Sequence, residues 1–483
     1  MNSQIFEKNI EKIHQDISTT WDKSIIPELV NYIKIPNKSI FYDSDWKAHG
    51  YMDEAIQLVV GWCRKQPIKN LQSEVVQLHE RTPLLFIEIP GQIDETILLY
   101  GHIDKQPEMQ GWEEDLGPWK PVLREDKLYG RGAADDGYAV FAALTAIETL
   151  QRYQIPHARC VVIIEASEES GSIDLPSYLS HLKDRIGKPN LVICLDSGCG
   201  NYEQLWCTTS LRGNISGTLK IEVLKNGIHS GLGSGIVPSP FLILRQLLDR
   251  IEDSRTGAII VDELKVAIPK QHQEQSKRIA ENIGQLISSH LPFLPNVKPI
   301  TSNSLELLFN TFWRPQLSVT GLDGLPPVAN AGNVTIPSLS VVLSLRTPPT
   351  LDTERAARVL KAIFEKDPPF NAQVSFCFES AAAGWVAPSL SEWLARANEK
   401  ASQQFFKNPA AYLGEGGTIP FMGMLGQMFP KAQFMITGVL GPLSNAHGPN
   451  EFLHISMGKK VTGCVASIVA AHCTHYSSNI DSK

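Results

Sequence analysis

The N-terminal part of the chain alternates short apolar runs with helical patterns. Strands are predicted at about 84–90, 96–101, 160–165 and 191–195, and most are apolar along their whole length rather than at every second position. Residues 138–150 between them have the composition and length of a buried helix, and residues 3–34 predict a pair of covering helices. Apolar strands separated by helices are typical of an α/β sheet that is covered on both faces.

The pattern changes at about residue 211. Two segments alternate like half-exposed strands and two predicted helices have charged outer faces, at 217–224, 338–345, 238–252 and 352–366. We expect an α+β domain at 211–383, inserted into a sheet domain of residues 1–210 plus 384–483. Two domains also agree with the length of 483 residues, because one hydrophobic core supports roughly 250 to 300. No element is assigned to most of 254–330.

Composition excludes several classes of protein. The sequence is 43% hydrophobic, has no apolar run of about 20 residues and begins with a polar segment unlike a signal peptide, so we expect a cytoplasmic protein without a membrane partner. The 44 basic and 51 acidic side chains form no basic block, which argues against nucleic acid as a partner. Eight cysteines without a C-x-x-C pair predict neither disulfides nor a structural zinc site.

Metal-type side chains follow the ends of three predicted strands. His102 follows the second strand, Glu168 and Glu169 follow the third, and Asp196 follows the fourth. Functional groups of α/β sheets gather beyond the carboxyl ends of the strands, so we expect these side chains in one site.

A glycine-rich turn ends in two adjacent carboxylates, Asp135 and Asp136. Gly130 and Gly132 permit backbone angles and close approach that a side chain would forbid. We interpret Asp135 as a bridge between two metal ions, since its two oxygens can each hold one cation. His447, in a polar loop, is a further candidate ligand. Zinc and manganese both accept histidine and carboxylate ligands.

These residue types fit hydrolysis of an amide. Two ions that share Asp135 would lower the pKa of a water molecule and stabilise a tetrahedral intermediate. Asp104, two residues after His102, would fix the imidazole tautomer. Glu168 and Glu169 diverge as neighbours, so one can bind metal while the other acts as general base and then acid. Isolated His-x-Asp or Glu-Glu pairs are more often surface features, but here apolar strands precede both.

Seven motifs together resemble the aminoacylase and carboxypeptidase family of co-catalytic zinc peptidases. Their order is most similar to the carnosinase and cytosolic non-specific dipeptidase branch. The similarity runs from about residue 20 to the C-terminus and is weakest at 254–330. The motifs are Tyr100-Gly-His-Ile-Asp104, Leu128-Tyr-Gly-Arg-Gly-Ala-Ala-Asp-Asp136, Glu168-Glu-Ser-Gly171, Leu195-Asp196, Gly227-Ile-His-Ser-Gly231, Glu415-Gly-Gly-Thr-Ile-Pro420 and Asn445-Ala-His447.

The resemblance implies a mixed-sheet α/β/α catalytic domain with an inserted α+β lid domain that dimerises. It implies two divalent metal ions, zinc first and manganese as the alternative. His102 and Asp196 would hold one ion, Glu169 and His447 the other, and Asp135 would bridge them. Glu168 matches the general base and Asp104 the orienting carboxylate. An Asp at position 196 favours a dipeptidase within this family.

Further implied roles concern the substrate. His229 matches a lid histidine that reaches the partner subunit's active site in the family's dimers, although from the residues alone it is a turn residue. Arg346 matches an arginine that binds the substrate's free carboxylate. Glu415, Gly417 and Thr418 match substrate contacts, although by itself this stretch could equally be a simple turn.

Three positions depart from the family pattern and leave the substrate open. Gly137 replaces a Lys after the Asp-Asp pair, Gly414 replaces an Arg, and Val334 replaces a polar residue.

Together, the motifs and the resemblance predict a homodimeric di-metal hydrolase that cleaves dipeptides or similar small peptides. Two alternatives are an N-acyl amino acid deacylase, which needs only a different pocket, and a non-catalytic binding protein, which would require a lost ligand or base.

Overall fold

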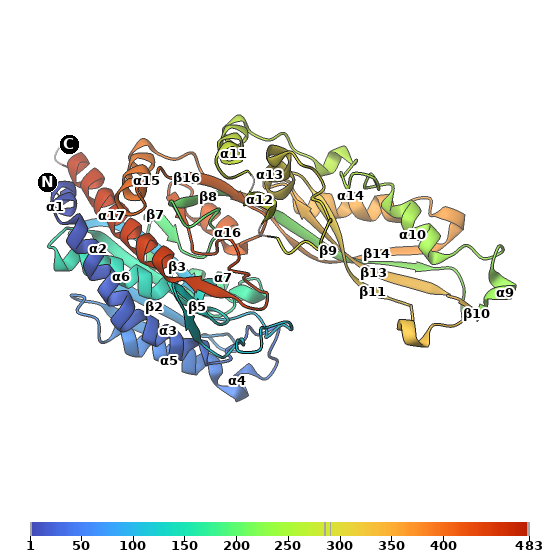
Figure 1. Ribbon diagram of the computed structural model, residues 1–483, viewed down its shortest axis with the longest axis horizontal. Helices are drawn as coiled ribbons and strands as arrows, with labels where there is room; N and C mark the ends of the chain where they lie inside the picture. Colours follow the sequence, from blue (N-terminus) through green and yellow to red (C-terminus); the bar gives the residue numbers. More distant parts are fainter. Residues whose placement is uncertain (1, 285, 290, 481–483) are drawn as a thin grey trace. The chain divides into compact units, whose positions relative to one another are not determined.

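The computed structural model describes residues 2–284, 286–289 and 291–480, and the chain divides into two compact units. The first consists of residues 1–209, 387–413 and 424–483, and the second of residues 210–386 and 414–423 (Figure 1). The segment 414–423 was expected in the sheet domain. It lies in the second unit because its contacts are made there: Thr418 donates a hydrogen bond to the Arg212 carbonyl and accepts one from Arg346.

The first unit contains a mixed six-stranded sheet in the order β1-β2-β6-β3-β7-β17. The neighbours β6, β3, β7 and β17 run parallel, whereas β1 and β2 are antiparallel. The predicted mixed-sheet α/β fold is thereby confirmed. The bounds are β1 Gln72–Val76, β2 Leu84–Ile89, β3 Ile93–His102, β6 Ala158–Glu165, β7 Pro189–Cys194 and β17 Gln433–Ile436.

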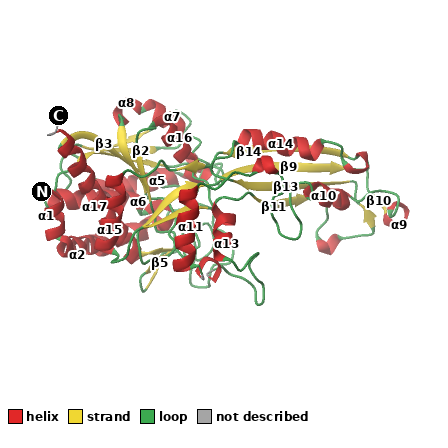
Figure 2. Cartoon of the chain, turned by 90° about the horizontal axis from the view of Figure 1, so that it is seen from above, coloured by secondary structure: helices red, strands yellow, loops and turns green. Residues whose placement is uncertain are grey.

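Helices lie on both sides of this sheet, which agrees with the largely apolar strands. Figure 2 shows α2, α6, α15 and α17 on one side and α7 and α8 on the other. The helices of this unit are α1 Asn2–Lys8, α2 Ile10–Thr20, η1 Trp21–Ile25, α3 Ile26–Ile33, α4 Trp46–His49, α5 Tyr51–Cys63, η2 Ala133–Gly137, α6 Ala139–Arg152, η3 Glu168–Ser170, α7 Leu175–His181, α8 Lys183–Ile186, α15 Glu392–Phe405 and α17 Ile455–Ile480.

The parallel strands bring the candidate ligands to one edge. β3 ends at His102, which lies opposite Glu165 at the end of β6, and Tyr100 of β3 lies opposite Cys194 at the end of β7. The residues that follow these strands therefore emerge together. A small sheet of β18 Phe452–His454, β5 Lys127–Tyr129 and β4 Val122–Arg124 places the chain after His447 beside the turn that contains Asp135.

The second unit contains an antiparallel four-stranded sheet in the order β11-β13-β9-β14. Alternate residues of β13 are buried under α10 and α14, as in a sheet covered on one face. The bounds are β9 Gly213–Glu222, α10 Pro240–Leu248, β11 Gln316–Asp323, β13 Ser338–Thr347, α14 Thr353–Glu365 and β14 Gln373–Ala382. The segment 254–330, unassigned from sequence, contributes β11 together with η4 Asp262–Leu264, α11 Lys270–Ile283, α12 Leu286–Ser289, α13 Ser304–Phe312 and η5 Val328–Asn330.

Short elements complete the chain. β10 Ile228–His229 pairs with β12 Val334–Thr335, and α9 Ser230–Gly233 follows β10. The others are β8 Trp206–Leu211, η6 Pro369–Asn371, β15 Trp385–Val386, β16 Ala411–Glu415 and α16 Pro420–Met428. Among the helices in the described part of the chain, none is long and apolar enough to cross a membrane.

Candidate metal centre

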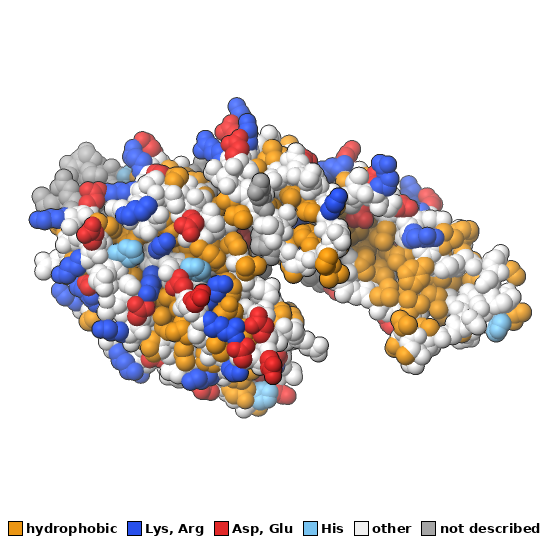
Figure 3. Space-filling view, in the orientation of Figure 1, with side chains coloured by type: hydrophobic (Ala, Val, Ile, Leu, Met, Phe, Trp, Pro, Cys, Tyr) orange, Lys and Arg blue, Asp and Glu red, His pale blue; other side chains and the backbone are white. Residues whose placement is uncertain are grey.

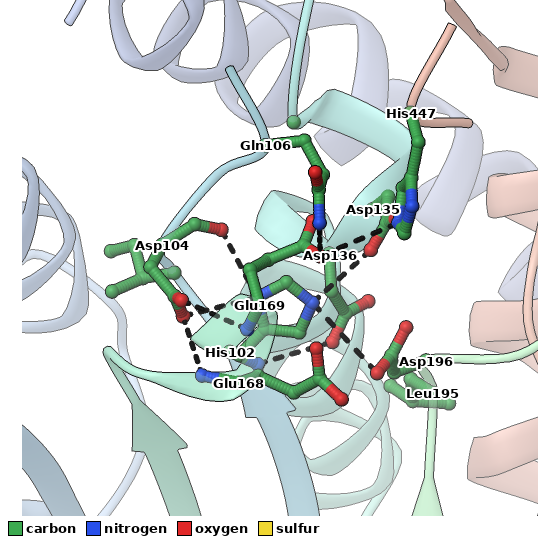
Figure 4. Close-up of polar contacts among 12 residues, drawn as sticks. His102, Asp104, Gln106, Asp135, Asp136, Glu168, Glu169, Leu195, Asp196 and His447 are labelled. Atoms are coloured by element: carbon green, nitrogen blue, oxygen red, sulfur yellow. Dashed lines mark hydrogen bonds and ion pairs between the residues drawn. The ribbon is translucent and has the colours of Figure 1, made fainter. Parts of the chain in front are cut away.

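Asp135 lies between two histidines that are more than 340 residues apart in sequence. Its Oδ1 is 3.1 Å from Nε2 of His102, and its Oδ2 is 3.0 Å from Nε2 of His447 (Figure 4). The two carboxylate oxygens thus face different imidazoles. This is the arrangement expected of a carboxylate that bridges two cations.

The glycines before Asp135 are required by the close packing of this turn. Gly130 has φ +141°, and a Cβ there would lie 2.4 Å from the Ile33 side chain. Gly132 has φ +84°, and its Cβ would lie 2.6 Å from the Lys105 side chain. Both positions combine a positive φ with no room for a side chain, as the sequence predicted.

His102 is fixed by contacts on both sides of its ring. Its backbone N–H donates to Oδ2 of Asp136 at 3.2 Å, and its Nδ1 is 3.1 Å from the carbonyl oxygen of Asp104. An Nδ1–H that donates to this carbonyl leaves Nε2 free to bind a metal, and Nε2 is 3.8 Å from Oδ2 of Asp196. The Asp104 carboxylate, expected to orient the ring, is farther from Nδ1, at 3.4 Å.

The Asp104 carboxylate also holds the turn that contains the two glutamates. Its Oδ1 accepts the backbone N–H of Glu168 at 3.1 Å, and its Oδ2 accepts that of Glu169 at 3.0 Å. Glu169 Oε2 then lies 3.4 Å from Nε2 of His447 and accepts a hydrogen bond from Gln106 at 2.5 Å. The Asp104 side chain therefore positions both glutamates through their backbone.

Two overlapping sets of side chains could each hold a metal ion. One set is His102, Glu168 and Asp196, and the other is His102, Asp135 and Glu169; the ligand atoms of each lie within 4.8 Å of one another. His447 adjoins the second set through Asp135 and Glu169. Imidazole nitrogens and carboxylate oxygens are suitable donors for zinc or manganese, so the residues present fit a pair of divalent cations.

The electrostatics of the site also fit bound cations. Burial raises the pKa of Glu168 well above its usual value and the nearby Asp196 raises it further, while burial and Asp135 do the same for the pKa of Glu169. Burial opposes ionisation of Asp135, yet hydrogen bonds from His102 and His447 hold its pKa far below its usual range. Several carboxylates are thus crowded where their negative charges repel, and divalent cations relieve that repulsion.

Sequence reasoning missed several groups that support the site. Gln106 binds Glu169, and Arg131 and Glu451 form a buried ion pair beside the Asp135 turn. The buried Glu165 accepts hydrogen bonds from Tyr100, Ser167 and Ser172, and burial raises its pKa to about 7. Arg131 and Glu451 stand within or beside the recognised motifs, but only the folded chain brings them together.

The predicted substrate residues form a separate group in the second unit. Arg346, on β13, donates from Nη1 to Thr418 Oγ1 at 3.1 Å. The carbonyl of Glu415 accepts the backbone N–H of Arg212, the carbonyl of Gly416 accepts Nε of Arg212, and Gly417 follows in the same segment. Gly414, which stands where the family pattern has an Arg, is explained by sterics, because a Cβ there would lie 2.8 Å from the Phe312 side chain.

His229 lies elsewhere in the second unit. It is exposed at the end of β10 and opposite Val334 of β12. Its Nδ1 accepts the backbone N–H of Gly231 at 3.1 Å. As the sequence suggested, its local role is to cap a turn.

Comparison with known proteins identifies the family. The sequence pattern of Peptidase family M20/M25/M40 matches residues 98–471, which include the metal-type residues of the first unit. The chain belongs to this family. The predicted resemblance and the prediction of a hydrolase are confirmed.

Similar proteins share most of the chain. The cysteinylglycine-S-conjugate dipeptidase of Corynebacterium striatum is 25% identical, over 75% of this chain and 79% of its own length. The Beta-Ala-His dipeptidase of Mus musculus is 26% identical, over 76% of this chain and 75% of its own length. The solved structure of the dipeptidase Dug1p from Saccharomyces cerevisiae, 20% identical, has a TM-score of 0.76 and covers 96% of this chain and 98% of that one. It establishes the shared fold.

Proposed function

We propose that this protein is a dipeptidase that requires two divalent metal ions. The observation that carries the proposal is the position of Asp135, whose two oxygens face His102 and His447 while carboxylates flank both imidazoles. Relatives in the same peptidase family are named dipeptidases, and they match this chain over three quarters of its length. The amide bond of a dipeptide or similar small peptide is the bond that we expect to be cleaved.

The position of each side chain supports a distinct ligand role for it. We propose that His102 and Asp196 hold one ion, that Glu169 and His447 hold the other, and that Asp135 is shared. Zinc is the first candidate and manganese the alternative, since both accept these donors. Such ions supply Lewis acidity, which lowers the pKa of water and polarises the scissile carbonyl.

Glu168 is proposed as the general base. Its backbone is held by Asp104, and burial with nearby carboxylates raises the pKa of its side chain, which favours proton uptake. Glu168 would take a proton from the attacking water and pass it to the nitrogen of the leaving amine. Its neighbour Glu169 contacts Gln106 and His447, so we propose different roles for the two glutamates.

Arg346 and Thr418 are proposed to bind the substrate's carboxylate, with Glu415 and Gly417 as further contacts. The Arg346 guanidinium is half-buried, and its burial lowers its pKa from the usual value. Thr418, at 3.1 Å, orients one of its nitrogens. A planar guanidinium held in this way suits a carboxylate, which can accept two parallel hydrogen bonds.

His229 is proposed to act on the substrate held by a partner subunit. β13 pairs with β9 so that Arg346 lies opposite Asn214 at one end and Ser338 lies opposite Glu222 at the other. His229 belongs to the segment beyond the second end. Eight residues of strand separate Ser338 from Arg346, which is about 26 Å at roughly 3.3 Å per residue. One dipeptide cannot reach both ends, so His229 and Arg346 of the same subunit cannot serve one substrate.

Exposed apolar side chains near His229 support a homodimer. Leu232 is 72% exposed, Ile236 81% and Val334 54%, and Val334 is the cross-strand neighbour of His229. Figure 3 shows hydrophobic side chains gathered on the visible face of the second unit. Large exposed apolar patches mark protein interfaces. We therefore propose that a second copy of this chain covers this region.

Turnover of two substrate panels tests the proposal. The purified protein should hydrolyse dipeptides, lose activity on treatment with a chelator and regain it when zinc or manganese is added. N-acetyl amino acids should be poor substrates. Turnover of only the N-acetyl compounds would replace the dipeptidase by a deacylase, and a folded, metal-loaded protein without turnover of either panel would favour a binding protein. The cytoplasmic location stays a prediction, which cell fractionation tests.

A further inference from the structure

A buried ion pair adjoins the candidate metal centre without contributing a ligand. The Arg131 guanidinium donates from Nη1 to Oε2 of Glu451, and the side chains are 1% and 0% exposed. These residues are 320 positions apart in sequence. Burying two charges is expensive, and an apolar pair is often at least as stable, so fold stability alone does not explain the pair.

The pair connects three segments that each contain a proposed metal ligand. Arg131 Nε donates to the carbonyl of Pro107, in the segment that follows His102, at 3.2 Å. Its Nη2 donates to the carbonyl of Gly448, next to His447, at 2.9 Å. Glu451 Oε1 accepts the N–H of Gly132, three residues before Asp135, at 2.9 Å.

The two proposed metal positions depend on this pair to different degrees. His102 is the last residue of β3, where pairing with β6 and a hydrogen bond to Asp136 fix it independently. His447 lies in a loop and has φ +65°, a conformation that few side-chain-bearing residues adopt. The contact of Arg131 with Gly448 fixes the residue immediately after it. His447 therefore relies more on the pair than His102 does.

We propose that Arg131 and Glu451 are positioning residues that hold His447 against Asp135, and that they set the affinity for the ion on the His447 side. This inference rests on the proposed di-metal function and identifies which of its two ions is the more easily lost. The supporting residues of metal ligands typically change metal affinity by about 10- to 100-fold when they are mutated.

Zinc titration of the metal-stripped protein tests the inference. Wild type should bind two ions. Glu451→Gln keeps the shape but removes the charge, and Arg131→Lys keeps the charge but removes the planar fork. Each variant should bind one ion within about threefold of wild-type affinity and the second at least about tenfold more weakly. Unchanged affinity for the second ion in folded variants would overturn the proposal.

Two controls separate positioning from folding. The double variant Arg131→Met with Glu451→Leu replaces the pair by apolar side chains and should recover thermal stability but not the second zinc ion; recovery of both would overturn the proposal. Arg159→Lys and Glu88→Gln alter another ion pair, at the opposite end of β6, and should leave zinc binding unchanged. Loss of the second zinc ion in these two control variants would also contradict the proposed positioning role.

Failure of the positioning role can be distinguished from failure of the proposed dipeptidase function. A wild-type protein that binds two zinc ions but cleaves no dipeptide refutes the dipeptidase, while the zinc titrations of the variants still decide the positioning role. A wild-type protein that binds fewer than two ions refutes both.

Discussion

The proposed sharing of active sites between two subunits makes a quantitative prediction for mixed dimers. Arg346 lies near one end of the ten-residue pairing of β13 with β9 and His229 lies beyond the other end, about 26 Å away or more at roughly 3.3 Å per residue. In the proposed homodimer, each active site therefore takes one of them from each subunit. We predict that His229→Ala lowers kcat by about 10²- to 10³-fold, as loss of a group that stabilises the developing oxyanion does.

The assay uses heterodimers purified through two different affinity tags. One subunit carries His229→Ala and the other Glu168→Ala. The site with an intact Glu168 then receives the intact His229 of its partner, while the other site lacks its base. One complete site of two should restore about half of the wild-type turnover per dimer, because the two sites of a symmetric dimer are equivalent.

A matched heterodimer provides the control. A dimer of Arg346→Ala and Glu168→Ala subunits should stay at least about 10- to 100-fold below the wild-type kcat/KM if Arg346 serves the site of its own chain. Activity in neither heterodimer would mean that both groups act within one subunit. Activity in both heterodimers would contradict the distance between His229 and Arg346 along β13. A monomeric wild-type protein would refute the shared site.

Three further predictions concern single side chains. Glu168→Gln should bind two metal ions, measured by elemental analysis, but lose about 10²- to 10⁴-fold in kcat because the general base is missing; near-full activity would assign the base elsewhere. Arg346→Ala should lose about 10- to 100-fold in kcat/KM for dipeptides, the value of a charge-assisted hydrogen bond, and much less for dipeptide amides, which lack the carboxylate; an equal loss for both would argue against carboxylate recognition. Burial raises the pKa of Glu165 to about 7, above its unfolded value of about 4.3. The folded protein therefore favours the protonated carboxyl, and the stability that this group contributes is complete below pH 4 and is lost as pH rises through 7. The unfolding free energy of wild type should therefore fall relative to Glu165→Gln between pH 5 and 8, by at most on the order of 3 kcal/mol in denaturant titrations, and a constant difference would refute the shift.

The sequence by itself determined the layout of the first unit and the candidate ligands. Apolar strands that lead into His102, Glu168 and Asp196 fix which residues emerge at one edge, because parallel strands share the direction of their carboxyl ends. The need for glycine before Asp135 was also predictable from the sequence, since a positive φ and tight packing leave few other residue types possible. The segment 254–330 could not be assigned from sequence, because its longest helix, α11, buries His272, Ser276 and Ile279 and therefore has few apolar positions that could reveal its period.

Only the tertiary structure decided which groups support the ligands. The carboxylate of Asp104 binds the backbone of Glu168 and Glu169 rather than lying closest to the His102 ring, and no spacing in the sequence distinguishes the two arrangements. The pairing of Arg131 with Glu451 across 320 residues is likewise invisible, because ion pairs are selected by distance in space. Local sequence specifies strands and turns through short-range sterics and burial, whereas partners between distant segments exist only after those elements have packed.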